Sequence, residues 1–462
     1  MIKTYDLKEE RFVPKQQVFR GNFFHAPKYG EIALLAQYLL VVDEAGIITA
    51  VLSPTAPNYV SVLAAAKTAG TLHDFGEQLV LPGFVDLHIH APQWPQAGVA
   101  LDAPLNVWLD QCTFPLEAKY RDLAFAQSVY TDLVAHLLSL GTTTAVYFAT
   151  QDLAASLTLA KVAAQAGQRA LVGKVAMDNP DQTPQDYRDR SSAAAVADTE
   201  TFILETRQLA QDAPQGVYPV VTPRFVPSCS SATLKGLGEL ADKYHTYIQS
   251  HCSEGEWEHH AVQVRFGRRD AEVLANFGLL GHKAIMAHCN FLNESDAALF
   301  AKSGTAIAHC PISNAYFANG VLPVHRLKQA GVEIGLGSDI SGGFSPSLYD
   351  NLKQAVISSR MLTDGVDVTR PVAERGVANS RISVAQAFYL ATRGGGKAVN
   401  LPLGQFKVGQ ICDFQVLDPK QPANQLPGLN LFPQPLDQLA KLLYLATPAN
   451  IMQVWVQGSR VK

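Results

Sequence analysis

The residues best suited to do chemistry stand together in the stretch Pro82-Gly-Phe-Val-Asp-Leu-His-Ile-His90. Apolar and polar side chains alternate through this stretch, which is the period of a β-strand. A strand sends alternate side chains to one face, so we expect His88 and His90 to point the same way. Two imidazoles side by side at a strand end form a pair of potential metal ligands.

Later strand-like runs also end in residues that bind metals, namely His251, His288, His309 and Asp339. A lone histidine on an apolar run is most often a structural residue. Five histidines and an aspartate at strand ends argue together for a metal site. Such ligands suit Zn²⁺ or Fe²⁺, and ligand type alone does not separate the two.

Three of these histidines are directly followed by a cysteine: Cys252, Cys289 and Cys310. If each histidine faces the inside of the fold, the next residue faces the helix layer. A buried cysteine there acts as a small apolar residue. We therefore predict no thiolate ligand.

Glu254 follows His251 by three residues, in the loop that leaves the same predicted strand. A carboxylate beside a metal and sheltered from water can transfer protons near neutral pH. The alternative is a solvated loop glutamate, which is how we interpret Glu256 and Glu258.

The middle of the chain alternates strand-like runs with helical ones. Helices are expected at 123–140, 153–166, 201–212 and 232–244, and strands at 82–90, 142–148, 169–177, 217–223, 247–251, 284–288, 305–309 and 333–339. Eight βα units close a TIM-type (β/α)8 barrel, an α/β fold whose active site lies at the carboxyl ends of the strands. The polar segment Asp178–Ala194 is expected to be a loop or lid after the third strand.

Both ends of the chain are rich in short β-runs and turns. We expect residues 1–75 and 401–462 to pair into one small β-sandwich, and residues 76–400 to form the catalytic barrel.

Composition limits the classes of partner. The 462 residues are 47% hydrophobic and 17% charged, with a formal net charge of −4, so phosphate-driven nucleic acid binding is not expected. No apolar window is long enough to span a membrane, and residues 1–10 contain no apolar signal core. The six cysteines form no C-x-x-C pair. We expect a cytoplasmic protein with free thiols.

The motifs Pro82–His90, Ser250-His-Cys-Ser-Glu254, Ala287-His288, His309-Cys-Pro-Ile-Ser-Asn314 and Gly335-Leu-Gly-Ser-Asp339 resemble those of the amidohydrolase superfamily. This resemblance covers nearly the whole chain. It implies that His88, His90, His251 and Asp339 hold the metal, with His288 as a further ligand or as the residue that holds the water. It also implies catalytic roles for Glu254, Asp339 and His288. The fourth strand, 217–223, lacks the lysine that bridges two metals in binuclear members, so one Zn²⁺ per subunit is expected, with Fe²⁺ as the alternative.

Within the superfamily, three features resemble the members that deaminate guanine. These are Gln93, the run Pro223-Arg224-Phe225 with Ser228-Cys229, and Met177-Asp178 followed by Pro184 and Tyr187. Arg224 can donate a fork of hydrogen bonds to the O6/N7 edge of guanine. Phe225 can stack on the purine, and Gln93 can both donate and accept. The implied substrate contacts are His90, Gln93, Trp94, Arg224, Phe225, His251 and Asp339. Pro92 and Trp94 depart from the serine and tyrosine common in such members.

The resemblance implies hydrolysis of guanine to xanthine and ammonia, in purine catabolism or salvage, by a homodimer. A first alternative is another mononuclear aminohydrolase, acting on cytosine, an adenosine thioether or an s-triazine. A second is a barrel that binds without catalysis, although no predicted metal ligand is missing.

Overall fold

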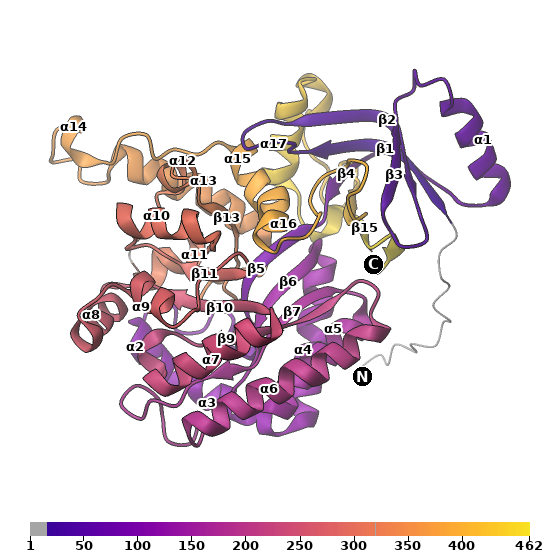
Figure 1. Cartoon of the computed structure of the whole chain (residues 1–462). Helices are drawn as coiled ribbons and strands as arrows, with labels where there is room; N and C mark the ends of the chain where they lie inside the picture. The colour runs from indigo at the N-terminus through magenta and orange to yellow at the C-terminus, as the bar shows by residue number, and fades with distance from the viewer. Residues whose placement is uncertain (1–15, 319) are drawn as a thin grey trace.

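The computed structural model describes residues 16–318 and 320–462 (Figure 1). The expectation that concerns residues 1–10 lies outside the described residues. Within them, no helix combines the length and the apolar character that crossing a bilayer requires.

Eight parallel strands pair in chain order and form the predicted barrel (Figure 1). They are β5 (Phe84–His90), β6 (Thr142–Phe148), β7 (Arg169–Gly173), β9 (Val217–Pro223), β10 (Tyr247–Cys252), β11 (Ala284–His288), β12 (Ala306–His309) and β13 (Glu333–Leu336). A two-residue strand, β8 (Val175–Ala176), follows β7 and also pairs with β9. The prediction of a (β/α)8 barrel is therefore confirmed.

The first and last barrel strands meet through backbone hydrogen bonds at their carboxyl ends. The amide of Asp339, just beyond β13, donates to the carbonyl of His88 at 2.8 Å. The amide of His90 donates to the carbonyl of Ile340 at 2.9 Å. These bonds place the histidines of β5 beside Asp339, although 249 positions separate His90 from Asp339 in the numbering.

Helices cover the outside of the barrel. The larger ones are α4 (Leu123–Ser139), α5 (Leu153–Ala166), α6 (Ser192–Leu209), α7 (Ser231–Tyr244), α8 (Glu256–Phe266), α9 (Asp270–Asn276), α10 (Glu294–Ser303), α12 (Val324–Gln329), α13 (Leu348–Asp364) and α15 (Val384–Tyr389). The expected starts of α4, α5 and α7 are right within one residue. Helix α6 begins nine residues earlier than expected because Ser191 caps it, accepting a hydrogen bond from the amide of Ala194 at 3.2 Å. The polar loop after the third strand therefore ends at Ser191.

Strands from both chain ends form one sheet in the order β16-β15-β14-β4-β1-β2-β3. Their bounds are β1 (Gln17–His25), β2 (Ala33–Val42), β3 (Ile48–Leu52), β4 (Leu72–Pro82), β14 (Phe414–Leu417), β15 (Ile451–Val456) and β16 (Ser459–Arg460). Strand β14 pairs antiparallel with β4, which confirms that the two ends come together. Aromatic residues from both ends share one core, with Phe19 and Trp455 rings 5.0 Å apart.

Two helices in these end segments were not expected from the sequence, α1 (Tyr59–Ala69) and α17 (Pro435–Leu445). The division at residues 75 and 400 stays a proposal.

A buried ion pair ties the barrel to this sheet. Arg169, at the start of β7, forms a two-pronged pair with Asp413, just before β14. Both side chains are almost completely buried, and Asp413 also accepts from the amide of Gln457 at 2.7 Å. Removing one partner leaves the other charge unpaired where water cannot reach it.

We predict that Asp413→Asn lowers the free energy of unfolding by about 3–5 kcal/mol, because Arg169 remains buried without its counter-charge. Urea denaturation measures this change. The control is Asp364→Asn, which removes the half-exposed pair with Arg381 and should cost less than about 1 kcal/mol. Equal losses in the two variants would contradict the role given to burial.

Candidate active site

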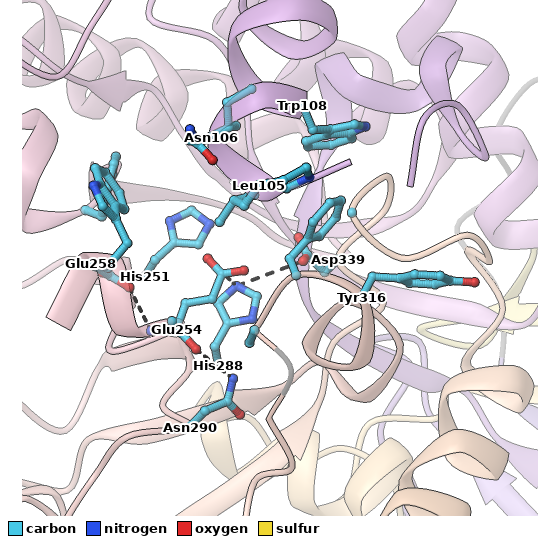
Figure 2. A pocket seen from close by; sticks show the side chains of 18 of the residues that line it. Leu105, Asn106, Trp108, His251, Glu254, Glu258, His288, Asn290, Tyr316 and Asp339 are labelled. Carbon is cyan, nitrogen blue, oxygen red and sulfur yellow. Dashed lines mark hydrogen bonds and ion pairs between the residues drawn. The ribbon is translucent and has the colours of Figure 1, made fainter. Parts of the chain in front are cut away.

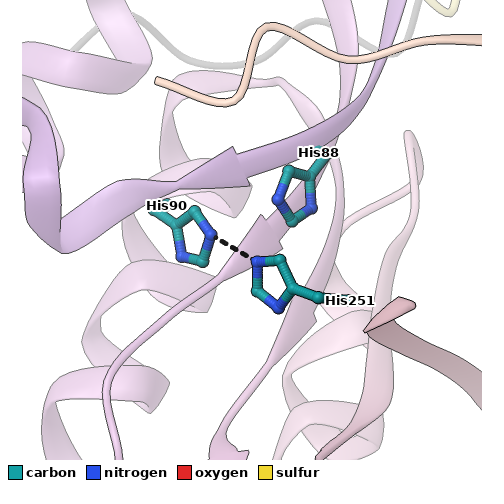
Figure 3. A group of neighbouring side chains, drawn as sticks. All are labelled: His88, His90 and His251. Carbon is teal, nitrogen blue, oxygen red and sulfur yellow. Dashed lines mark hydrogen bonds between the residues drawn. The ribbon is translucent and has the colours of Figure 1, made fainter. Parts of the chain in front are cut away.

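Three imidazoles from β5 and β10 face one another in the mouth of the barrel (Figure 3). Nε2 of His90 lies 3.0 Å from Nε2 of His251. The ring of His88 is centred 4.8 Å from that of His90 and 4.9 Å from that of His251. All three side chains are buried. A register irregularity between Asp86 and Ile89 interrupts the alternation of β5, yet both histidines of the pair reach the same cluster.

These histidines are electrostatically suited to bind a cation. Burial holds the pKa of His88, His90 and His251 well below the ordinary value, so the rings are neutral near pH 7. Nδ1 of His251 donates to the carbonyl of Arg224, which leaves the lone pair on Nε2. Nε2 of His88 is buried without a well-formed hydrogen bond in the described structure. A metal ion would satisfy that atom, so these residues fit a bound metal.

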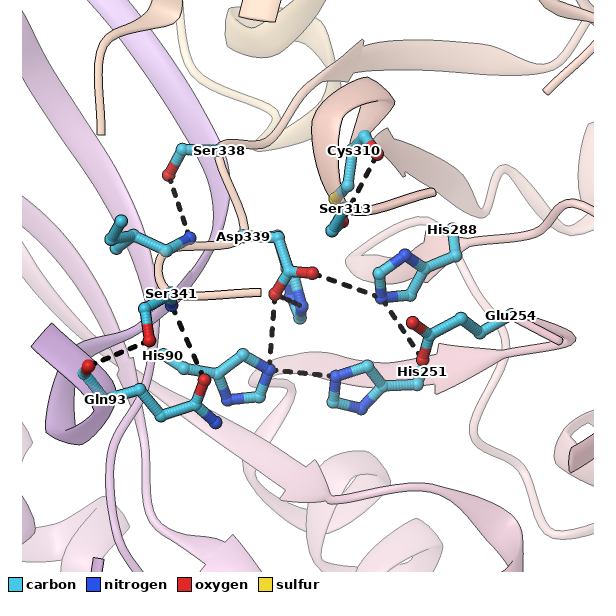
Figure 4. Close-up of polar contacts among 12 residues, drawn as sticks. His90, Gln93, His251, Glu254, His288, Cys310, Ser313, Ser338, Asp339 and Ser341 are labelled. Atoms are coloured by element: carbon cyan, nitrogen blue, oxygen red, sulfur yellow. Dashed lines mark hydrogen bonds and ion pairs between the residues drawn. The ribbon is translucent and has the colours of Figure 1, made fainter. Parts of the chain in front are cut away.

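Asp339 lies next to this cluster (Figure 4). One of its oxygens, Oδ1, is 3.2 Å from Nε2 of His88 and 3.6 Å from Nε2 of His90. The other, Oδ2, is 3.9 Å from Nε2 of His288. Burial raises the pKa of Asp339, while the neighbouring His288 opposes that shift. The carboxylate is thus shared between the candidate metal ligands and His288.

A chain of amides orients His288. Its Nδ1 donates to Oδ1 of Asn314 at 2.9 Å, so the lone pair is on Nε2, which faces the cavity. Asn314 in turn donates to Asn290 at 2.9 Å, and Asn290 donates to the carbonyl of Glu254 at 3.0 Å. The sequence motif ending in Asn314 gave no role to this residue.

Glu254 sits opposite, with Oε2 3.7 Å from Nε2 of His288 (Figure 2). Burial, followed by the nearby Asp339, raises the pKa of Glu254 to about 8, so its carboxyl can carry a proton near neutral pH. Its backbone amide donates to Oε2 of Glu258 at 2.7 Å. Glu256 is exposed as expected, but the prediction of a solvated Glu258 is wrong, because helix α8 turns that side chain inward against the Glu254 loop.

His309 and Cys310 exchange the positions expected for them. Ala306 and Ala308 of β12 belong to the cluster inside the barrel, whereas Ile307 packs among residues of the helix layer. Alternation places His309 with Ile307, outside the cluster of metal-binding candidates, and burial lowers its pKa to about 3. Cys310 follows the end of β12 and lies on the inner side, where its Sγ is within 4.8 Å of ring nitrogens of His88 and His288. Cys252 and Cys289 pack in the helix-layer cluster as expected.

The site opens into a cavity of about 950 Å³ (Figure 2). Its lining includes these sequence-predicted residues: His90, Gln93, Arg224, Phe225, His251, Glu254, His288 and Asp339. Trp94 does not line it. That side chain donates to Asp132 of α4 at 2.6 Å and packs on His136, which corrects its expected contact with substrate. Both residues lie in the short 3-10 helix Ala91–Gln96 after β5, where Gln93 lines the cavity and Trp94 contacts α4.

Comparison with known proteins agrees with this geometry. Residues 79–461 match the model of the amidohydrolase family. The chain therefore belongs to the amidohydrolase family.

Within this family, the chain is similar over its full length to guanine deaminases. A guanine deaminase of Dictyostelium discoideum is 35% identical, over 96% of this chain and 98% of the relative. The human guanine deaminase is 34% identical, over 97% of each chain. A crystal structure of guanine deaminase from C. acetobutylicum, with guanine bound in its active site, superposes with a TM-score of 0.84 at 30% identity. It covers 97% of this chain and 100% of its own.

We predict that His251→Asn reduces bound metal from about one ion per chain to less than about 0.2, because a metal site of this kind depends on each of its few protein ligands. Metal analysis of the purified protein measures this. The control is His309→Asn, at a buried histidine outside the cluster, which should keep its metal. Loss of metal in both variants, or in neither, would contradict the assignment.

Proposed function

We propose that this chain is a guanine deaminase, which hydrolyses guanine to xanthine and ammonia. The observation that carries the proposal is one cavity that joins a metal-binding histidine cluster, a buried proton-transfer carboxyl and the candidate base-reading pair Arg224 and Gln93. The full-length guanine deaminase relatives support the same reaction.

We further propose one Zn²⁺ per subunit, held by His88, His90, His251 and Asp339, with His288 beside it. A divalent metal supplies the Lewis acidity that makes water nucleophilic near neutral pH. A single metal is supported by the fourth barrel strand, β9, which contains no lysine. The nearby Lys174 follows the end of β7. It is buried and bound to Asp189 at 2.8 Å, which occupies its amine.

The residues of the chain then move protons. Asp339 accepts a proton from the attacking water, and the lone pair on Nε2 of His288 accepts its hydrogen bond. Glu254 donates its proton to the ring nitrogen beside C2, which makes C2 electrophilic. The oxygen of the water bonds to C2, Asp339 passes the proton it accepted to the amino group, and the bond from C2 to that nitrogen breaks as ammonia leaves. The C2 hydroxyl gives its proton to Glu254 as the carbonyl of xanthine forms, which restores the starting protonation of both carboxyls.

Arg224 and Phe225 line the same cavity and are the proposed binding residues. Arg224 donates to the oxygen-bearing edge of the base, and Phe225 packs against its plane. His90, His251 and Asp339 approach the reacting carbon. Burial of Arg224 and Gln93 favours a partner with matching donors and acceptors, since unmatched buried groups are costly.

A cytoplasmic location and a homodimer complete the proposal. The six cysteines form no disulfide, as expected of a reducing compartment. The segment around α14 (Val372–Arg375) projects from the barrel and exposes Val366, Val368 and Val372, which a second copy could cover (Figure 1).

We expect metal-replete protein to convert guanine to xanthine, which ultraviolet absorbance follows directly. Cytosine, an adenosine thioether and an s-triazine serve as comparison substrates and should react far more slowly. Faster turnover of any of them than of guanine would contradict the proposal.

We predict that Glu254→Gln lowers kcat by about 10²–10⁴-fold, because the amide cannot supply the proton. The metal content should stay unchanged, since Glu254 is not a proposed ligand. Glu294→Gln, at an exposed glutamate of α10, is the control and should retain full activity. Near-normal turnover by Glu254→Gln would remove Glu254 from the mechanism.

A further inference from the structure

Glu117 is a buried carboxylate behind the cavity that no step of the proposed mechanism uses. It ends α3 (Phe114–Glu117), in the long segment between β5 and α4. Its exposure is 1%, and it is not among the residues that line the cavity. Any influence on the substrate must therefore pass through the side chains that it contacts.

The first of these is Arg224. Nη1 of Arg224 donates to Oε2 of Glu117 at 2.8 Å, and Nη2 donates to Oε1 at 3.3 Å. The ring of Phe114 covers the guanidinium at 5.1 Å. A two-pronged pair fixes the guanidinium plane as well as its position. The donors that Glu117 leaves free are those that remain for a ligand in the cavity.

The second contact is Gln93. Its Nε2 donates to Oε1 of Glu117 at 3.0 Å. A carboxylate only accepts, so it selects one orientation of the amide, with the NH2 group toward Glu117 and Oε1 away from it. Figure 4 shows the carbonyl oxygen of this amide directed to the amide of Ser341, 3.5 Å away. Gln93 thus presents an acceptor beside the donors of Arg224.

This pair of groups matches one kind of ring edge. A lactam edge, as in guanine, carries a carbonyl oxygen next to a ring N–H. Arg224 can donate to the oxygen while Gln93 accepts from the N–H. An amidine edge, as in adenine, offers an amino donor next to a bare ring nitrogen and mismatches both groups. Mismatched polar groups in a buried site are strongly disfavoured.

We propose that Glu117 is a positioning residue that fixes the orientations of Arg224 and Gln93 relative to each other. It thereby sets the preference for a lactam edge. This inference rests on the proposed function of the same cavity. It differs in that the selecting residue is outside the cavity and never touches the substrate.

Charge explains why a carboxylate stands here rather than another acceptor. Arg224 is only 3% exposed, and burial alone would lower its pKa. The charge of Glu117 and its hydrogen bonds outweigh that effect, so the pKa of Arg224 lies above its ordinary value. A neutral residue at position 117 would leave Arg224 without its counter-charge, and only the long contact from the amide of Ser341 would then orient the Gln93 amide.

The test is Glu117→Gln, with hypoxanthine and unsubstituted purine as probes. Both lack the 2-amino group, so their dissociation constants report binding without turnover. Hypoxanthine has the lactam edge and purine does not. We expect KM for guanine and Kd for hypoxanthine to rise about 10- to 100-fold, the magnitude of one or two charge-assisted hydrogen bonds. Kd for purine should change less than about threefold, and metal content should not change.

Three further variants separate positioning from folding. Glu117→Asp keeps the charge and should recover part of the lactam preference. The double variant Glu117→Gln with Arg224→Gln removes both charges, so it should fold even if the single variant is unstable. It should bind hypoxanthine and purine with similar Kd values. Asp413→Asn breaks an ion pair of similar burial at the end sheet and should leave the ratio of the two Kd values unchanged.

The inference is overturned if hypoxanthine keeps its advantage over purine in Glu117→Gln, or if both probes weaken equally in that variant. These outcomes are distinct from failure of the proposed function. That failure would appear as a wild-type protein that does not convert guanine, whereas the ratio of Kd values needs no turnover.

Discussion

The site depends on the closure of the barrel between its first and last strands. Backbone hydrogen bonds from Asp339 to His88 and from His90 to Ile340 join β5 to the segment after β13. No local contact could bring these residues together, because almost the whole barrel lies between them in the sequence (Figure 1). The candidate cation site therefore forms only in the complete fold. The shape of the cavity above it depends on the same closure of the barrel.

Burial then sets the charge state of the side chains that closure of the barrel brings together. Imidazoles that water does not reach stay neutral and can offer lone pairs, while the pKa of the Glu254 carboxyl rises to about 8. The guanidinium of Arg224 is the exception, since it stays charged and needs a buried counter-charge. The candidate cation site thus contains neutral imidazoles. The proposed base-binding residues include Arg224, in its buried ion pair with Glu117.

How much of this the sequence predicts depends on the regularity of the backbone. The strand-like runs predict the barrel and the strand ends that carry the cluster. Alternation does not place every ligand, since the register of β5 is irregular and His288 has a φ of 67° at the end of β11. The sequence misplaced His309 and Cys310 because it took His309 as inward-facing, whereas Ala306 and Ala308 are the inward-facing residues of β12. Glu117 ends the short helix α3, in a segment whose sequence has no periodic signal, and Asn314 orients His288 rather than lining the cavity. Such residues become visible only when distant segments are brought together.

The end sheet has a consequence for how the chain is made. Strand β4 leads directly into the barrel, but one of its edges is covered by β14, which is synthesised only after all barrel strands. During translation, that edge would present unpaired backbone groups next to a folding barrel. A chain that ends before β14 would therefore be prone to edge-to-edge association through β4. In the complete chain, β14 pairs with that edge of β4 and removes this risk.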